Sequence, residues 1–186
     1  DLCAGAGGKT LALAAAMDNR GRLIACDVDR PRLSRLAPRA ERAGAAIVHT
    51  CLLNPGQETA ALAEWQGKAD AVLVDAPCSG SGTWRRNPEA RWRLDEAELA
   101  RTRKVQQHVL NVGAGLVRPG GRLLYAVCSV LDEEGADQVR AFLDANPGWR
   151  AERPETSAGR ERGPGLRMTP FHDETDGFFV ARLVSP

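Results

Sequence analysis

The segment Ala69–Asp75 restricts the fold of this chain more than any other, because it is an almost continuous apolar run that ends in an acid. Such a run is typical of a strand buried on both faces, and strands of this kind occur in parallel sheets that helices cover on each side. We therefore expect this segment to form the centre of a parallel sheet, with ligands binding at the carboxyl ends of the strands.

The rest of the chain alternates predicted strands and helices at spacings that require βαβ crossovers. Further strands are expected at Arg22–Cys26, Ala46–Thr50, Arg122–Val127 and Gly177–Val184. Helices are expected at Lys9–Met17, Asp29–Ala43, after Gly56 to about Trp65, Asp95–Val117 and Leu131–Ala145. We expect Ala76–Leu94 and Arg150–Arg167 to be loops, the second of them exposed. The predicted fold class is α/β, with a doubly wound, mostly parallel, Rossmann-like sheet.

Size and composition limit the class of protein. The 186 residues, of which 43% are apolar and 26% charged, fit one domain spanning the whole chain. A net charge of +1 provides no overall attraction for nucleic acid, so any basic site must be local. The five dispersed cysteines form no C-x-x-C pair, which predicts neither a disulfide framework nor a metal site. No apolar run approaches membrane-spanning length, and we expect a cytoplasmic monomer.

A glycine-rich turn follows the first two residues and precedes the first predicted helix. It contains Cys3, Ala4, Gly5, Ala6, Gly7, Gly8 and Lys9. A dinucleotide fingerprint would need a third glycine where Thr10 stands, and a phosphate-binding P-loop would need a glycine at Cys3. A site for S-adenosylmethionine (SAM) fits, because Asp27 lies at the spacing of a ribose-binding acid. Alternatively, the glycines serve only to let the helix pack tightly against the strand. A P-loop-like NTPase stays a rival function for the protein.

Two cysteines stand at the ends of predicted strands. Cys78 lies in a Pro- and Gly-rich loop directly after Asp75, and Cys128 follows the strand Arg122–Val127. Structural cysteines usually lie inside a strand or helix, as Cys26 is expected to do. Two thiols and an acid at the active edge of a sheet are hard to explain by packing, so we interpret them as candidate catalytic groups.

Five segments in order carry a specific resemblance that covers nearly the whole chain. They are Asp1–Thr10, Asp75–Gly80, Arg85–Pro88, Tyr125–Ser129 and Asp176–Phe179. They resemble the successive motifs of the RNA cytosine-5 methyltransferases, in particular the Sun/Fmu (RsmB-like) group that modifies small-subunit ribosomal RNA. The resemblance implies SAM as cofactor and RNA as substrate. It also implies that Cys128 is the nucleophile, that Cys78 assists product release and that Asp75 corresponds to the family's acid.

Cytosine chemistry explains why such an enzyme needs these residue types. Carbon 5 of cytosine is a poor nucleophile until a thiolate adds at carbon 6, and the resulting enamine can then take a methyl group. A base must afterwards remove the carbon-5 proton while the thiolate leaves. Asp75 can hydrogen-bond the amino edge of the ring, and the resemblance implies that Asp75 also contacts the cofactor together with the glycine turn and Asp27.

The chain also departs from the family pattern. Ala6 stands where the family turn usually has Pro, and Val127 where the later motif usually has Thr. No acid occurs in the region Val48–Leu52, where relatives have an Asp facing the adenine, so a non-catalytic RNA-binding scaffold is a second rival function. Because the chain opens on Asp1-Leu2, we expect the first strand to be truncated and an upstream RNA-binding region to be absent.

The segment Trp84–Arg93 interleaves four Arg with two Trp beside the proposed pocket. Such a mixture suits phosphate contacts and stacking on unpaired bases. Alternatively, the tryptophans belong to the core and the arginines pair with Asp95, Glu96 and Glu98.

Overall fold

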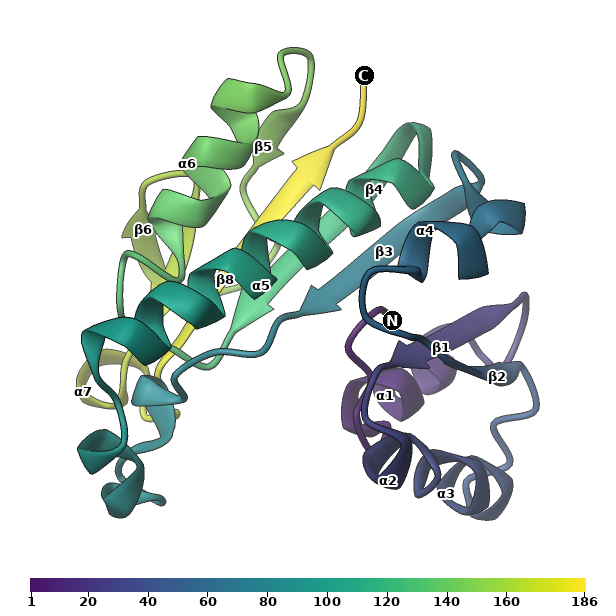
Figure 1. Cartoon of the computed structure of the whole chain (residues 1–186), viewed down its shortest axis with the longest axis horizontal. Coiled ribbons are helices and arrows are strands. Elements are labelled where there is room, and N and C mark those ends of the chain that lie inside the picture. The colour runs from purple at the N-terminus through teal and green to yellow at the C-terminus, as the bar shows by residue number, and fades with distance from the viewer. The chain divides into compact units, whose positions relative to one another are not determined.

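A computed structural model describes residues 1–186 and divides them into two units, Asp1–Trp65 and Gln66–Pro186, each built on its own sheet (Figure 1). No helix in it is long and apolar enough to cross a bilayer. The α/β, Rossmann-like class expected from the alternation of helices and strands is confirmed, and each unit is described separately below.

The first unit contains the parallel strands β1 (Leu23–Asp27) and β2 (Val48–Leu52), which pair in register from Leu23 opposite Val48 to Asp27 opposite Leu52. Helix α1 (Gly8–Ala16) precedes β1. The short helix α4 (Glu58–Ala61) and a 3-10 turn at Ala63–Trp65 follow β2. Ala4, Ala25, Leu33 and Leu36 form one of its buried clusters, which packs the glycine turn against β1.

The single helix expected at Asp29–Ala43 is wrong, because the chain forms two helices, α2 (Arg30–Leu33) and α3 (Leu36–Arg42). The expected N-cap is confirmed, since Asp29 Oδ1 accepts a hydrogen bond from Arg32 N at 2.8 Å. Pro38 accounts for the break: it has no N–H to donate, and in a continuous helix its ring would meet the carbonyl of Ser34. Restarting the helix at Leu36 places Pro38 in a first turn, where proline is tolerated.

The second unit is built on a six-stranded sheet. Strands β3 (Ala69–Asp75) and β4 (Val117–Val127) are parallel, and β4 pairs antiparallel with β8 (Phe178–Val184). The sheet is therefore less parallel than expected, because its C-terminal strands run antiparallel. Burial also alternates along β3, where Val72 and Val74 are buried and Leu73 is half-buried, instead of both faces being covered equally.

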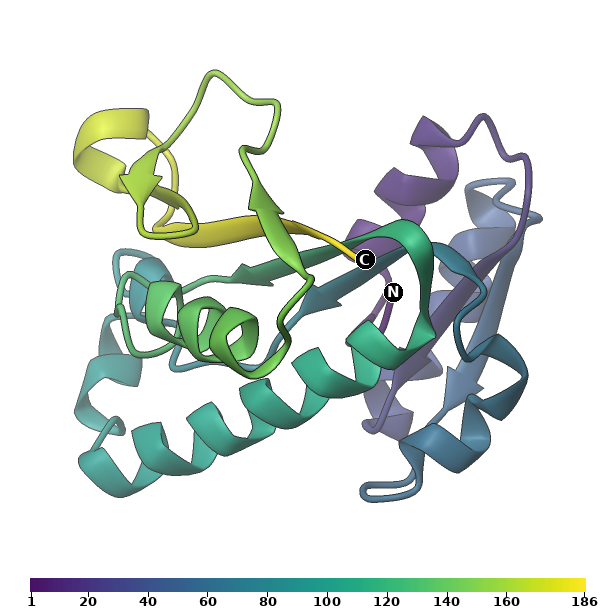
Figure 2. The same ribbon diagram turned by 90° about the horizontal axis from the view of Figure 1, so that it is seen from above.

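Two helices cover one face of this sheet (Figure 2). Helix α5 (Glu96–Leu116) packs on β3 and β4, and α6 (Ala136–Ala145) packs beside α5. The approach is close at Gly113, where a Cβ atom would lie 2.9 Å from Val74 Cγ2. As expected, Asp95 caps α5, its Oδ1 accepting from Glu98 N at 2.7 Å. Helix α6 begins five residues later than expected, leaving 131–135 as a turn after Cys128.

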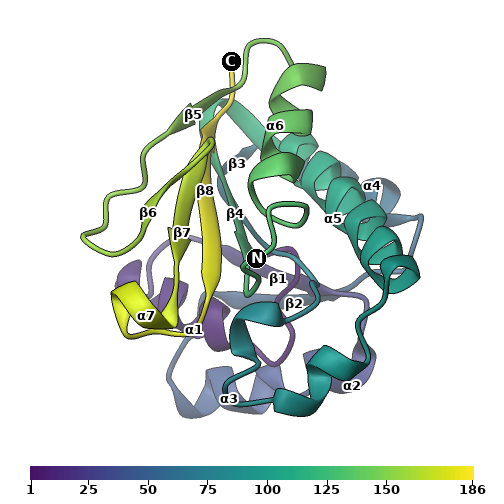
Figure 3. The ribbon, with the colours of Figure 1, turned by 90° about the vertical axis from the view of Figure 1, so that its left-hand side faces the viewer.

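The exposed loop expected at Arg150–Arg167 is wrong. This segment forms β5 (Arg150–Glu152), β6 (Arg160–Arg162) and the start of β7 (Gly165–Met168), and Figure 3 shows them extending the sheet beyond β8. Strands β5 and β7 both pair antiparallel with β8, while β6 pairs with β7. Gly165 permits this arrangement, because a Cβ atom there would lie 2.4 Å from the Val180 carbonyl oxygen. The residues of β5 and β6 are mostly polar and charged, so the sequence shows no apolar pattern typical of a strand there. Helix α7 (Pro170–Asp173) then leads into β8.

Candidate active site

In the first unit, the glycine turn passes directly into α1, as the sequence predicts. Gly5 and Gly7 have positive φ values of 54° and 84°, a conformation that favours glycine. A Cβ atom on Gly7 would lie 1.9 Å from Leu36 Cδ1, so this glycine is required by packing. A Cβ atom on Gly8, by contrast, would meet nothing within 4 Å. Gly8 is the first residue of α1, whose first backbone N–H groups have no acceptor within the helix.

Asp27 ends β1 and is buried beside this turn. Its Oδ2 accepts a hydrogen bond from Gly5 N at 2.7 Å, and its Oδ1 accepts from Asp29 N at 2.8 Å. The carboxylate therefore joins the end of β1 to the glycine turn, and each oxygen keeps a second acceptor position. These residues fit a cofactor that presents hydroxyl donors at the strand end and an anionic group at a helix N-terminus. Strand β2 contains no acid and ends at the apolar Leu52.

In the second unit, the two predicted thiols lie together. Cys78 Sγ is 3.3 Å from Cys128 Sγ, although the two residues are 50 positions apart in the chain. Cys78 lies in the loop after β3, and Cys128 follows β4, whose parallel pairing with β3 aligns their carboxyl ends. Asp75, the last residue of β3, is half-buried and pairs with Ala126.

The contact between the two thiols disfavours ionisation of Cys78. The hydrogen bond between Cys78 and Cys128, and next the burial of Cys78, raise the pKa of Cys78 far above its usual value. Two thiols in contact cannot both ionise easily, since like charges would then meet in a poorly solvated place. Cys26, predicted as structural, is buried inside β1, and burial raises its pKa to about 12.

A pair of buried serines joins the two cysteine-bearing loops. Ser81 Oγ lies 2.8 Å from Ser129 Oγ, and Ser81 Oγ also accepts from Val130 N at 3.1 Å. In addition, Gly82 N donates to the Cys128 carbonyl oxygen at 3.0 Å. The loop after β3 and the loop after β4 therefore form one connected structure, which brings Cys78 and Cys128 into the same region.

Sequence reasoning missed two buried residues behind Cys78, namely Gln106 of α5 and Glu134 of the turn before α6. Glu134 accepts hydrogen bonds from the backbone N–H and the hydroxyl of Ser79. In the sequence, Glu134 is one acid of an ordinary Asp-Glu-Glu run, which carries no signal of burial. The burial of Glu134 depends on how the turn after Cys128 folds back behind Cys78, and it could be found only from the three-dimensional structure.

The structure argues against the interpretation in which the segment Trp84–Arg93 has core tryptophans and arginines paired with the acids at the start of α5. Trp92 is 77% exposed and lies 4.3 Å from the guanidinium of Arg91, so it is not a core residue. Arg86 pairs with Asp176, Nε to Oδ2 at 2.7 Å, instead of with the acids at the start of α5. This pairing holds the pKa of Asp176 below its usual value. Trp84 is half-buried, and its indole N–H has no hydrogen-bond partner.

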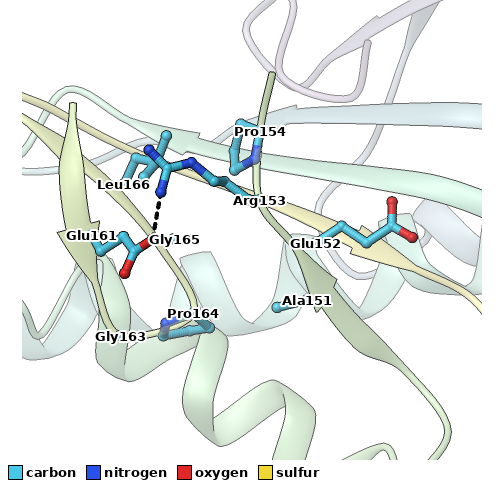
Figure 4. Close-up of a pocket in the computed structure, with 9 residues that line it drawn as sticks. All are labelled: Ala151, Glu152, Arg153, Pro154, Glu161, Gly163, Pro164, Gly165 and Leu166. Carbon is cyan, nitrogen blue, oxygen red and sulfur yellow. Dashed lines mark hydrogen bonds and ion pairs between the residues drawn. The ribbon is translucent and has the colours of Figure 1, made fainter. Parts of the chain in front are cut away.

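Figure 4 shows a separate hollow of about 180 Å³ between β5 and the β6–β7 hairpin. The ion pair between Arg153 and Glu161 lies across it, and Leu166 is among the residues that line it. None of the predicted site residues lines this hollow. Nearby, Arg162 and Arg167 both pair with Asp132. The arginines of this segment are therefore largely engaged by acids of the same unit.

Comparison with known proteins decides the family. The family model "16S rRNA methyltransferase RsmB/F" matches residues 1–184. The chain belongs to this family. The resemblance to the Sun/Fmu (RsmB-like) group, inferred from the five ordered segments, is thereby confirmed, and the P-loop interpretation of the glycine turn receives no support.

Individual members of the RsmB/F family show the extent of the similarity. Ribosomal RNA small subunit methyltransferase B of Citrobacter koseri is 37% identical over 186 residues, which cover 99% of this chain and 41% of the relative. The corresponding protein of Salmonella typhi is 38% identical over 189 residues, again covering 99% and 41%. The chain thus spans about two fifths of the length of these curated relatives.

Solved structures agree with this assignment. The crystal structure of PH0851 has a TM-score of 0.90 and 38% identity, covering 98% of this chain and 41% of that one. NSun6 from Pyrococcus horikoshii, solved with SFG, has a TM-score of 0.87 and 26% identity, covering 100% and 47%. An O-methyltransferase from Bacillus cereus in complex with SAH has a TM-score of 0.60 at 14% identity, which shows the shared fold alone.

Proposed function

We propose that the protein transfers a methyl group from SAM to carbon 5 of a cytosine in small-subunit ribosomal RNA, through a covalent adduct with Cys128. In this proposal, residues 1–186 are the catalytic domain of a cytoplasmic enzyme. Membership of the RsmB/F family supports the rRNA substrate, and the NSun6 structure with SFG supports a cofactor of the SAM type.

The glycine turn and Asp27 would hold the cofactor. SAM, when bound, supplies an electrophilic methyl group on a sulfonium centre. The turn Cys3–Lys9 would bind its methionine part at the start of α1, where the open space over Gly8 leaves room. Asp27, already oriented by Gly5 N and Asp29 N, has free acceptor positions for ribose hydroxyls. Asp75 completes the proposed set of cofactor contacts.

The thiol pair would supply the covalent chemistry. We assign the thiolate of the pair to Cys128, as the resemblance to the cytosine-5 methyltransferases implies, and the Cys78 thiol can then donate a hydrogen bond to that thiolate across the 3.3 Å contact. Its sulfur forms a bond to carbon 6 of the cytosine, and the electron pair displaced to carbon 5 forms the new carbon–methyl bond. The bond between that methyl group and the sulfonium sulfur breaks in the same step, so S-adenosylhomocysteine would be the leaving group. Loss of the carbon-5 proton and cleavage of the sulfur–carbon bond restore the ring and the Cys128 thiolate. The Cys78 thiol, 3.3 Å away, can stabilise that leaving thiolate by hydrogen bonding.

Contact with RNA would involve Trp92 and the surrounding arginines. A cytosine must leave its stack to reach buried catalytic groups, so the flanking nucleotides must be unpaired or displaced. The exposed ring of Trp92, with Arg91 against it, offers a surface on which a displaced base could stack.

The observation that carries the proposal is the 3.3 Å contact between the two thiols at the ends of adjacent parallel strands. The test is transfer of tritiated methyl from SAM to unmethylated small-subunit rRNA, followed by mapping of the labelled base. The proposal expects 5-methylcytosine at one position. Label on another atom would contradict the assignment to carbon 5 of cytosine. No transfer together with retained RNA binding would favour the non-catalytic scaffold, for which the apolar Leu52 at the end of β2 is the favouring observation.

A further inference from the structure

Gln106 and Glu134 lie behind the loop that carries Cys78, and neither side chain is exposed to solvent. Gln106 belongs to the middle of α5, and Glu134 belongs to the turn between β4 and α6. Neither takes part in the chemistry proposed above. Burying a carboxyl and an amide together costs free energy unless their hydrogen bonds are made, so their partners indicate what they do.

Their hydrogen bonds reach the residues on both sides of Cys78. Glu134 Oε1 accepts from Ser79 N at 2.8 Å, and Glu134 Oε2 accepts from Ser79 Oγ at 2.5 Å. Gln106 Nε2 donates to the Pro77 carbonyl oxygen at 3.0 Å and to Glu134 Oε1 at 3.1 Å. The residue before Cys78 and the residue after it are therefore fixed by a single connected pair, named here the Gln106–Glu134 clamp.

Another buried side chain holds the clamp in place, and the hydrogen bonds of Gln106 determine the orientation of its amide group. Tyr125 of β4, which is fully buried, donates its hydroxyl to the Glu134 carbonyl oxygen at 2.7 Å. The Gln106 amide faces two acceptors, so its NH2 group must point toward them, and its Oε1 is left buried without a hydrogen-bond partner. An unpaired buried acceptor lowers stability. Gln106 therefore orients the Cys78 loop at a cost to the stability of the core.

We propose that Gln106 and Glu134 are positioning residues that hold the Cys78 thiol against Cys128 and thereby set the rate at which the methylated RNA is released from its covalent adduct. The inference rests on the proposed function, because it assigns the clamp to the release step. The inference leaves nucleophilic attack to Cys128. The carbonyl oxygen of Cys128 accepts from Gly82 N, and the neighbouring Ser129 pairs with Ser81, in bonds that do not include Gln106 or Glu134.

The first test separates adduct formation from adduct release. Gln106→Met keeps the side-chain volume and removes both donors, while Glu134→Gln keeps the shape and replaces one acceptor by a donor. Matched controls are Gln107→Met and Glu133→Gln, which change exposed neighbours in the chain. A displaced catalytic group typically slows its step about 10²-fold. We therefore expect both clamp variants to accumulate protein–RNA adduct and to lose turnover, while the rate of adduct formation and both controls stay unchanged.

A second test needs no RNA. Diamide takes two electrons and two protons from a pair of thiols, and the Cys78–Cys128 disulfide can form quickly only if the sulfurs are held close. Clamp variants should form this disulfide more slowly than the wild type and both controls, as mapped by peptide mass spectrometry. An unchanged rate would overturn the inference even if a variant had altered stability.

A double variant, Gln106→Met in a Cys78→Ala background, separates a failure of this inference from a failure of the proposed function. Because the clamp acts through Cys78, it should cause no further loss of release there. Equal losses in both backgrounds, or a parallel fall in adduct formation and turnover, would show a general structural role and overturn the inference. If Cys78→Ala alone accumulates no adduct, the proposed function fails and the inference fails with it.

Discussion

Cys78 and Cys128 lie with their sulfur atoms 3.3 Å apart, at the ends of two parallel strands that are separated in the chain by helix α5. This contact couples the ionisation of the two thiols. Since the hydrogen bond to Cys128 is the largest cause of the raised pKa of Cys78, the ionisation of each cysteine depends on the presence of the other. Removing one thiol must therefore alter the reactivity of its neighbour.

Replacing Cys128 by Ser should make Cys78 more reactive. The contact with Cys128 raises the pKa of Cys78, so weakening it lowers that pKa and increases the thiolate fraction at a given pH. We expect faster alkylation of Cys78 by iodoacetamide at pH 8 in Cys128→Ser than in the wild type, measured by peptide mass spectrometry. Cys26, inside β1, is the internal control and should keep its rate. Slower labelling of Cys78 would contradict the assigned pairing.

Two adjacent glycines should respond differently to alanine. Gly7→Ala combines a positive φ of 84° with a clash against Leu36, and should lower the free energy of unfolding by about 2 kcal/mol or more. Gly8→Ala meets open space and should leave stability unchanged. If the cofactor occupies that space, a steric cost of about 1.4 kcal/mol would weaken SAM binding about tenfold. Urea unfolding and calorimetric SAM titration measure the two effects. Unchanged SAM affinity in Gly8→Ala would contradict the proposed binding mode.

The ion pairs of Asp132 should make the free energy of unfolding fall as the pH is lowered below about 4. Hydrogen bonding to Arg162, with the nearby charges of Arg162 and Arg167, lowers the pKa of Asp132 from 3.8 to about 2. A lowered carboxyl pKa contributes stability that is complete above about pH 4 and is lost as the pH falls through about 2. Asp132→Asn should therefore be less stable than the wild type at pH 5, and the difference should shrink toward pH 2.

Urea unfolding at a series of pH values checks this expectation, with Asp144→Asn, at an exposed position of α6, as the control. A difference between Asp132→Asn and the wild type that stays constant from pH 5 to pH 2 would contradict the role assigned to the ion pairs of Asp132.

Trp92 should contribute to RNA binding without contributing to stability. Stacking of one base on an aromatic ring is worth about 1–3 kcal/mol, so Trp92→Ala should weaken binding of single-stranded rRNA fragments about tenfold or more. Because the ring is 77% exposed, the thermal midpoint should not change. Phe171→Ala, which removes another aromatic ring that is 87% exposed, serves as the control in the same fluorescence anisotropy titration. An equal loss in both variants would argue against a specific stacking position.

Periodicity predicted those elements whose local sequence agrees with their final environment. Helix α5 begins at its expected cap, Asp95, and β3 has the expected bounds, because a cap and an apolar run act locally. The strands β5 and β6 are not apparent in the sequence because their residues are mostly polar. Strand β6 pairs with β7 across a short turn, whereas β5 pairs with β8, which lies far away in the chain. Pairing energy of that kind is set by tertiary contacts and leaves little trace in the sequence.

The candidate site was predictable to a similar degree. The loop positions of Cys78 and Cys128 indicated that both thiols lie at the same edge of the sheet, since parallel strands align their carboxyl ends. Their direct contact was not predicted. The buried support behind them could not be inferred, because Gln106 and Glu134 occur among ordinary polar residues of a helix and a turn. Their burial is determined by which side of α5 faces the sheet and by where the turn after β4 closes.

Covalent trapping tests the central claim, that Cys128 attacks the cytosine, most directly. Wild type, Cys78→Ala and Cys128→Ala are incubated with rRNA and SAM, denatured, and examined for protein–RNA adducts, whose attachment site is mapped by peptide mass spectrometry. We predict that Cys78→Ala accumulates an adduct attached at Cys128 and that Cys128→Ala forms none. An adduct in Cys128→Ala attached at Cys78 would contradict the account and exchange the roles of the two thiols.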